Sequence, residues 1–217
     1  MPSAQHQTLS APPVPTLPDP GQSYSDKVQR GHNGLVRTFM TRLTGALQSI
    51  LGNAGGQYID NPNGLFFNTT SQSIAAVNTA YPITFNQTYL NNHVSVVDSS
   101  KLTVAVGGIY NFQYTGSVNS TSSSAKNIFL WIRRNGTDIG YSCAPYTLSG
   151  SGTYGRITWN FSIDLDEGEY VEIYWGASDT TVTLSTVAAS SPYPAIPASV
   201  CAVMYSSALP FTRPTAP

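Results

Sequence analysis

Charged side chains are scarce in this sequence. Asp, Glu, Lys and Arg make up 10% of its 217 residues, whereas roughly 25% is usual in a globular protein. The formal net charge is −1, so the composition gives no electrostatic reason to expect binding to nucleic acid or to an anionic membrane. Because the apolar content is close to average, Ser, Thr, Asn, Gln and Tyr replace the missing charges. Their hydroxyls and amides would keep the chain in solution.

Long apolar runs and cysteines are scarce as well. No stretch approaches the ~20 apolar residues of a membrane helix, and residues 1–20 lack the basic start and apolar segment of a secretory signal. The two cysteines, Cys143 and Cys201, are too far apart for a metal knuckle and too few for a disulfide framework. We therefore expect no membrane span and two buried thiols. The sequence leaves open whether these thiols pair.

Groups that carry catalysis are equally rare. Of the three histidines, only His93 lies in the β-rich part of the sequence described below, and no Ser lies on a recognisable nucleophile turn. No glycine-rich phosphate loop opens a helix, and no His–Cys spacing suits zinc. The sequence thus predicts a protein that is not an enzyme and that binds no metal or cofactor.

One group of carboxylates needs separate consideration. Five acidic residues lie close together in the sequence: Asp164, Asp166, Glu167, Glu169 and Glu172. Asp164 and Asp166 would share one face of a strand at ~7 Å, a spacing that glycosidases use, and carboxylate oxygens also suit Ca²⁺. Because Ile163 and Leu165 would occupy the opposite, buried face, we expect the acidic side chains to face water and keep the hairpin soluble.

The first zone of the chain, residues 1–21, contains six prolines. Such a segment forms neither a helix nor a central strand, and it buries nothing by itself. It is either a disordered tail or an extended arm that lies on another protein, and in isolation we expect it to be disordered.

The second zone, residues 22–56, has the apolar spacing of a helix, with Ser25 as the N-cap and Gly52 as the stop. The predicted anchor stripe consists of Val36, Phe39, Leu43, Leu47 and Ile50, with Met40 and Ala46 beside it. So short a helix is marginal alone, and it therefore needs either copies of itself or a neighbouring protein. Four basic residues form its outer face, which is either solvated or docked on an acidic surface: Lys27, Arg30, Arg37 and Arg42. The residues GNAGG at 52–56 are predicted to be a flexible joint.

The third zone, residues 57–217, has the pattern of β-structure. Strands are predicted at 65–67, 83–89, 94–97, 101–106, 108–118, 127–134, 137–147, 155–165, 169–176, 181–187 and 199–206. Asn135-Gly136 has the chemistry of a type I′ hairpin, and Gly168 marks a second tight reversal. About ten antiparallel strands in this length predict an all-β sandwich of two sheets, and among such folds we expect a jelly roll.

Three segments carry a resemblance to a known family: GGIYNFQYTGSV (107–118), IFLWIRRNGTDI (128–139) and FSIDLDEGEYVEIYW (161–175). With Gly108, Tyr110 and Phe112 in the first and Asn135-Gly136 in the second, residues 60–207 resemble the jelly roll of complement globular heads and tumour-necrosis-factor-like domains. The resemblance implies a homotrimer in which one sheet of each subunit packs around a threefold axis. The whole layout of arm, helix and jelly roll also resembles proteins of bacteriophage particles, in which such domains cap fibres or decorate heads.

Two sets of aromatic residues are candidates for contacts with partners. Tyr110, Phe112 and Tyr114 share one face of a predicted strand, where they would either fill the core or form the trimer interface. Three long polar loops, at 116–127, 146–156 and 188–199, are rich in hydroxyl side chains. Tyr146, Tyr154 and Tyr193 on the second and third of them would either stack on sugars of a bacterial surface glycan or be solvated.

Together these observations predict a non-enzymatic structural protein of a phage virion, assembled in the host cytoplasm. Residues 1–52 would contact other virion proteins, and a trimeric jelly-roll head would project from a tail fibre and adsorb to the host. Two alternatives stay open. One is a capsid decoration protein that clamps neighbouring coat subunits. The other is a glycan-binding lectin or, after it, a glycan hydrolase.

Overall fold

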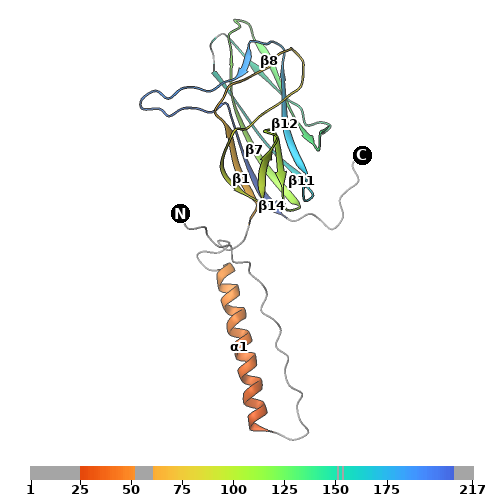
Figure 1. Cartoon of the computed structure of the whole chain (residues 1–217), viewed down its shortest axis with the longest axis vertical. Coiled ribbons are helices and arrows are strands. Elements are labelled where there is room, and N and C mark those ends of the chain that lie inside the picture. Colours follow the sequence, from red (N-terminus) through yellow and green to blue (C-terminus); the bar gives the residue numbers. More distant parts are fainter. Residues whose placement is uncertain (1–24, 52–60, 151, 153, 208–217) are drawn as a thin grey trace. The chain divides into compact units, whose positions relative to one another are not determined.

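A single long helix, α1 (Asp26–Leu51), represents the N-terminal unit of the chain (Figure 1). The computed structural model describes residues 25–51, 61–150, 152 and 154–207, and the chain divides into two compact units, residues 1–60 and 61–217. The predicted arm, residues 1–21, and the predicted joint, residues 52–56, lie outside the described residues.

The start of α1 agrees with the predicted N-cap. The backbone N–H of Gln29 donates to the carbonyl of Ser25 at 3.0 Å, which closes the first turn. The helix spans 26 residues and is therefore longer than the apolar stripe that predicted it. It runs without interruption through Gly31, Gly34 and Gly45, each of which has open space where a side chain would be.

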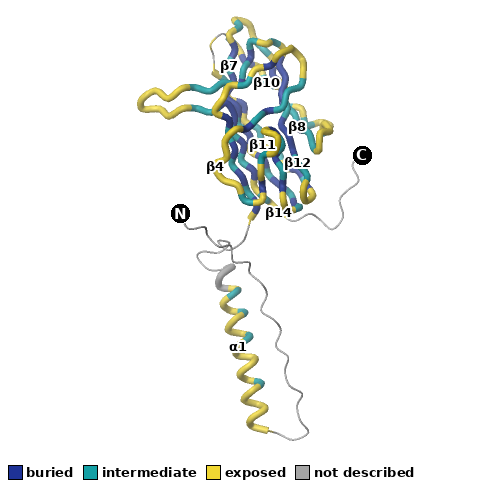
Figure 2. Tube along the Cα trace, viewed as in Figure 1, coloured by how far each residue is buried: buried dark blue, intermediate teal, exposed yellow. Residues whose placement is uncertain are grey.

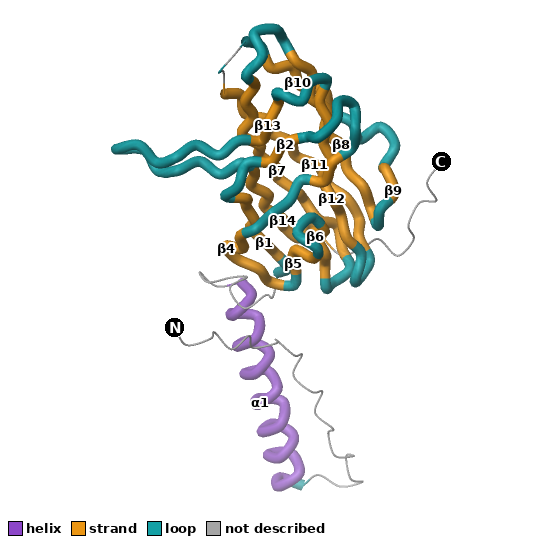
Figure 3. The backbone as a smooth tube through the Cα atoms, turned by 45° about the horizontal axis from the view of Figure 1, so that its top comes forward, coloured by secondary structure: helices purple, strands orange, loops and turns teal. Residues whose placement is uncertain are grey.

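The C-terminal unit is an antiparallel sandwich of two sheets with a jelly-roll arrangement (Figure 3). The first sheet, called sheet A here, has the order β2-β13-β7-β14-β1-β4, and β11 also pairs with β7. The strand β13 pairs with the C-terminal end of β7, at residues 118–120. The bounds of its strands are β1 Asn63–Asn68, β2 Gln72–Ser73, β4 Gln87–Asn92, β7 Gly108–Ser120, β11 Tyr154–Leu165, β13 Val182–Leu184 and β14 Ser199–Ser207.

Sheet B has the order β10-β8-β12-β6-β5, with β9 pairing with β8 and β3 pairing with β12. The bounds of its strands are β3 Tyr81–Pro82, β5 Val94–Val97, β6 Lys101–Val104, β8 Lys126–Arg134, β9 Thr137–Asp138, β10 Ala144–Leu148 and β12 Tyr170–Ala177. Both predicted turns are confirmed, because Asn135 and Gly136 have φ of 48° and 80° and Gly168 has φ of 82°.

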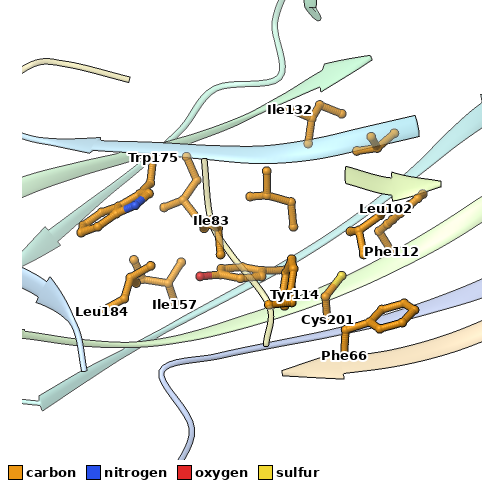
Figure 4. Close-up of a cluster of buried hydrophobic side chains, with 14 of the residues drawn as sticks. Phe66, Ile83, Leu102, Phe112, Tyr114, Ile132, Ile157, Trp175, Leu184 and Cys201 are labelled. Carbon is orange, nitrogen blue, oxygen red and sulfur yellow. The ribbon is translucent and has the colours of Figure 1, made fainter. Parts of the chain in front are cut away.

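The core lies between the facing sides of the two sheets (Figures 2 and 4). Strand alternation explains its membership, since every second residue of β7, β11 and β12 points inward. Tyr110, Phe112 and Tyr114 are 0–1% exposed and belong to this core. The predicted alternative of a trimer interface at these three residues is therefore wrong, because all three side chains are buried in the core of a single chain.

Most predicted strands match, and the two that fail have a visible cause. In the run predicted at 83–89, residues 83–86 form no strand because they cross between the sheets. The N–H of Ile83 donates to Ile173 at 2.8 Å, and that of Phe85 donates to Ser99 at 2.7 Å. The run predicted at 137–147 is broken into β9 and β10 by a loop in which Tyr141 has φ of 61°.

Candidate recognition surfaces

The outer face of sheet A is almost free of charge. Six of its seven strands, β1, β2, β4, β7, β13 and β14, contain no Asp, Glu, Lys or Arg. The exceptions are Arg156 and Asp164 of β11, which pair with Ser117 and Ile109 near opposite ends of β7. A sheet face that is exposed in a monomer usually carries charges that keep it soluble, so their absence here marks a surface suited to burial.

Amides and small apolar groups occupy this face instead. Asn111 on β7 donates its side-chain amide to Oδ1 of Asn160 at 2.6 Å and to Oγ of Ser162 at 3.2 Å, both on β11. On the other side of β7, the register places Ala202 beside Gln113 and Met204 beside Asn111. The face therefore combines hydrogen-bonded amides with an apolar strip that includes Met204, 42% exposed.

A long loop between β13 and β14, residues 185–198, projects from the head like a finger (Figure 3). Two bridges hold its strands together, Val187 with Ile196 and Ser190 with Tyr193, and its outer part is exposed (Figure 2). An open apolar hollow lies at its base, lined by Phe67, Thr69, Thr186, Val187, Ala188, Ala195, Ile196 and Pro197. The finger, like the adjoining strands, carries no charged residue.

The outer face of sheet B has the opposite character. Among the charged residues of its strands, Lys101 and Arg133 alternate with buried neighbours and so lie on this face, where Arg133 pairs with Asp138 of β9, while Glu172 of β12 is on the same side but buried. At its centre, the register places Trp131 of β8 beside Tyr174 of β12. Their ring centroids are 5.9 Å apart and the rings are tilted by 35°.

Charged groups hold these two rings in place. Nε1 of Trp131 donates to Oδ1 of Asp138 at 2.7 Å, and Nε of Arg133 donates to the same oxygen at 2.6 Å. The Arg133 guanidinium also lies over the Tyr174 ring, 3.9 Å from its centroid. The hydrogen bonds from Arg133 and Trp131 lower the pKa of Asp138, and the bond to Asp138 raises the pKa of Arg133, so both groups stay charged at neutral pH.

Sequence reasoning missed these four residues, here called the aromatic platform: Trp131, Arg133, Asp138 and Tyr174. The signal was present, because the inward positions Val171, Ile173 and Trp175 of β12 imply that Tyr174 points outward. What the sequence does not show is that β8 and β12 are neighbours, and only this pairing brings Trp131 to Tyr174.

The acidic cluster at 164–172 serves structure. Glu169 pairs with Arg134, accepts a hydrogen bond from Asn135 Nδ2 at 2.7 Å and accepts another from the backbone N–H of Asp166 at 2.8 Å. Asp164 lies 3.6 Å from the same Arg134. Glu172 is buried, contrary to the expectation that the cluster faces water, and it accepts a hydrogen bond from Ser100 at 2.6 Å. Among the described side chains, no three of His, Cys, Asp and Glu come close enough together to hold a metal ion.

The three loop tyrosines are not brought together on one surface. Tyr146 is half-buried and packs against the core, and its hydroxyl lies 2.7 Å from the place where a Cβ on Gly155 would be. Tyr154 is 57% exposed and pairs with Asn119 at the end of sheet A, whereas Tyr193 is 73% exposed on the finger. Contact of these three tyrosines with a glycan stays a prediction, and Tyr154 and Tyr193 are the two whose side chains are exposed.

The predicted helix stripe is present on α1. Val36 and Leu47 are 39% and 46% exposed, while Phe39 and Leu43 are half-buried. Ile50 lies within the helix, but its side chain is outside the described part. In the described part of the helix, the stripe forms one apolar side that its own unit leaves largely open to solvent.

The cysteines differ from the expectation of two buried thiols. Cys201 is buried in β14, but Cys143 is exposed in the loop before β10, and neither forms a disulfide. Burial raises the pKa of the Cys201 thiol well above its usual range. In the parts of the chain that are described, no helix has the length and apolar character needed to cross a membrane.

Comparison with known proteins gives a likeness of fold only. No protein-family model and no curated protein sequence matches the chain. Among solved structures, the chain is similar to the globular domain of zebrafish complement 1qA protein, with 16% sequence identity and a TM-score of 0.43 over 67% of this chain and 96% of that chain.

Proposed function

We propose that this chain is a non-enzymatic structural protein of a phage virion, a homotrimeric fibre whose jelly-roll head recognises the host surface. The observation that carries the proposal is the unequal distribution of charge between the outer faces of the two sheets. An uncharged face loses little free energy when it is desolvated against copies of itself, whereas a face with charges and half-buried aromatic rings suits the outside of an assembly.

The trimer contact in this proposal is the outer face of sheet A, formed by β11, β7, β14 and β1. Ala202 and Gln113 lie side by side near the middle of β7 and β14. Around them, Thr115, Thr158 and Asn160 provide groups that hydrogen-bond without charge. The interface thus replaces the predicted contact through Tyr110, Phe112 and Tyr114 with the opposite face of the same sheet.

The attachment role falls to residues 1–52 in this proposal. The apolar stripe of α1 would contact copies of itself or the other virion proteins, and Lys27, Arg30, Arg37 and Arg42 add a basic surface to the helix. The division of the chain into two compact units supports this, because every residue of the described core cluster belongs to the head, between Phe66 and Val203.

The trimer is tested by the mass of the full chain in light scattering. We expect three times the chain mass, and we expect Ala202→Glu to give monomers, because it would place three carboxylates in an uncharged interface. Thr103→Glu, on the outer face of sheet B, is the matched control and should keep the trimer. A monomeric wild-type chain at micromolar concentration would refute the trimer.

The virion role is tested by the protein content of purified particles. A few trimers per particle support a tail fibre, and hundreds of chains would instead indicate a capsid decoration protein. Deletion of residues 1–52 should leave a folded, soluble head that is absent from particles. Normal incorporation of the truncated chain would contradict the attachment role.

A further inference from the structure

We infer that the aromatic platform on sheet B, formed by Trp131, Arg133, Asp138 and Tyr174, is a binding site for an uncharged saccharide. The inference rests on the proposed recognition role and gives it a location and a class of ligand. It does not depend on the trimer or on the attachment of residues 1–52.

The rings provide the apolar part of the site. Trp131 and Tyr174 lie side by side on neighbouring strands. Two residues further along β12, Gly176 is buried, and a Cβ there would lie 3.0 Å from the carbonyl oxygen of Thr79 and 3.9 Å from Cη2 of Trp131, so the Thr79 backbone bounds the platform on this side. Phe129, 36% exposed, pairs with Gly176 and extends the aromatic row towards β10. The C–H face of a sugar ring packs well on such a shallow aromatic surface.

The charged pair provides the polar part. A guanidinium has five donors and a carboxylate about four acceptor positions. The contacts given above use Nε of Arg133 and Oδ1 of Asp138, so both groups retain capacity for the hydroxyls of a ligand. The Asp138 side chain is 59% exposed at the edge of the rings. Because three contacts fix Arg133 and Asp138 in advance, little conformational entropy would be lost on binding.

The charge balance selects the ligand class. Arg133 and Asp138 cancel, so the platform has no net charge to attract a polyanion such as nucleic acid. A protein partner would require a face several times larger than four side chains. A small, flat, neutral surface with paired hydrogen-bonding groups fits one or two uncharged sugar units.

The alternative is that the four residues only stabilise sheet B through cross-strand pairing. That role predicts that substitutions lower stability and change no binding. The two explanations are separated by the full chain on an immobilised panel of bacterial O-chain and capsular oligosaccharides, followed by titration with the soluble oligosaccharide that binds.

We expect Trp131→Ala to weaken binding by about tenfold or more, the loss of one buried ring contact. Trp131→Phe, which keeps a ring, should retain part of the affinity. Tyr89→Ala is the matched control, because Tyr89 is an exposed tyrosine, 74% accessible, on β4 of the other sheet. The indole N–H resonance of Trp131 should shift on addition of the oligosaccharide, and a purely structural role would leave it unmoved.

Three results would overturn the inference. The first is an absence of binding to every neutral oligosaccharide by the folded full chain, and the second is unchanged affinity in folded Trp131→Ala. The third is loss of affinity only in Tyr154→Ala or Tyr193→Ala, which would return recognition to the loops. None of these results bears on the oligomeric mass or on particle incorporation, so a failure of this inference is distinguishable from a failure of the proposed function.

Discussion

Tyr110 and Tyr114 lie on the same inward face of β7, yet only the hydroxyl of Tyr110 has a hydrogen-bond partner. It donates to the carbonyl of Val106 at 2.6 Å, whereas the buried hydroxyl of Tyr114 has none among the described residues. Burial raises the pKa of Tyr110 to about 12 and raises that of Tyr114 as well. Ser199 lies near the Tyr114 hydroxyl and opposes this rise of the pKa, but the geometry between the two side chains is not that of a hydrogen bond.

This difference predicts opposite effects of the same substitution. Tyr110→Phe should lower the free energy of unfolding by about 1 kcal/mol, because it leaves the Val106 carbonyl without its donor. Tyr114→Phe should leave it unchanged or raise it by up to about 1 kcal/mol, because it removes an unpaired polar atom from the core. Urea unfolding of the two variants checks this. A loss in Tyr114→Phe equal to that in Tyr110→Phe would show that the Tyr114 hydroxyl is hydrogen-bonded in solution.

A second prediction concerns Glu169 and acid stability. Burial alone would raise the pKa of Glu169, but the bonds from Arg134, the Asp166 backbone N–H and Asn135 outweigh it, and the pKa lies below its usual value. A lowered pKa in the folded state stabilises the fold above the unfolded pKa of about 4.3, and this stabilisation is lost as the pH falls through the folded pKa.

Glu169→Gln should therefore be less stable than the wild type by about 1–2 kcal/mol at pH 7. The difference should shrink as the pH falls below the unfolded pKa and through the lowered folded pKa. Thermal unfolding at a series of pH values measures it. Glu167→Gln, an exposed neighbour, serves as the control and should show no such trend. A difference that is constant with pH would mean that the carboxylate charge of Glu169 is not what holds the two hairpin turns together.

The cysteines give a third prediction. Cys143 is exposed and Cys201 is buried with a raised pKa. A thiol reagent should modify one equivalent in the native chain and two after unfolding, because the thiolate is the reactive form. Cys143→Ser should abolish the native reaction. Rapid modification of two equivalents without denaturant would show that β14 opens readily.

Much of the head follows from its sequence because local chemistry and alternation agree there. Val94–Val97 forms a strand with the predicted bounds, and Asn135-Gly136 forms the predicted turn. The failure at 83–86 has the same physical origin as the successes: Ile83 and Phe85 alternate into the core, but their N–H groups bond to Ile173 of β12 and to Ser99 in the β5–β6 turn, so no single strand pairs with them. Alternation reports which side is buried and not which strand is the partner.

The candidate sites were harder to predict for the same reason. Tyr110, Phe112 and Tyr114 were recognised as one face, but the sequence did not show whether that face was core or interface. The aromatic platform depends on the register between β8 and β12, a contact between residues more than forty positions apart, such as Trp131 and Tyr174. Local patterns carry no information about such a pairing.

The last prediction concerns the glycines of α1. If the stripe repeats every seven residues from Val36 to Leu43, then Gly31 and Gly34 fall on the opposite, outward side of the helix, and neither has any atom within 4 Å of an added Cβ. Gly31→Ala and Gly34→Ala should each stabilise the helix by about 1 kcal/mol. Slower hydrogen exchange of the amides of Asp26–Leu51 in the full chain would show this.

Val36→Ala is the contrasting variant, because it removes apolar area from the stripe. It should speed the exchange of the same amides wherever copies of the helix or partner proteins cover the stripe. If the two glycine variants instead weaken self-association of the full chain, the glycine side of α1 is the contact surface and the stripe is not.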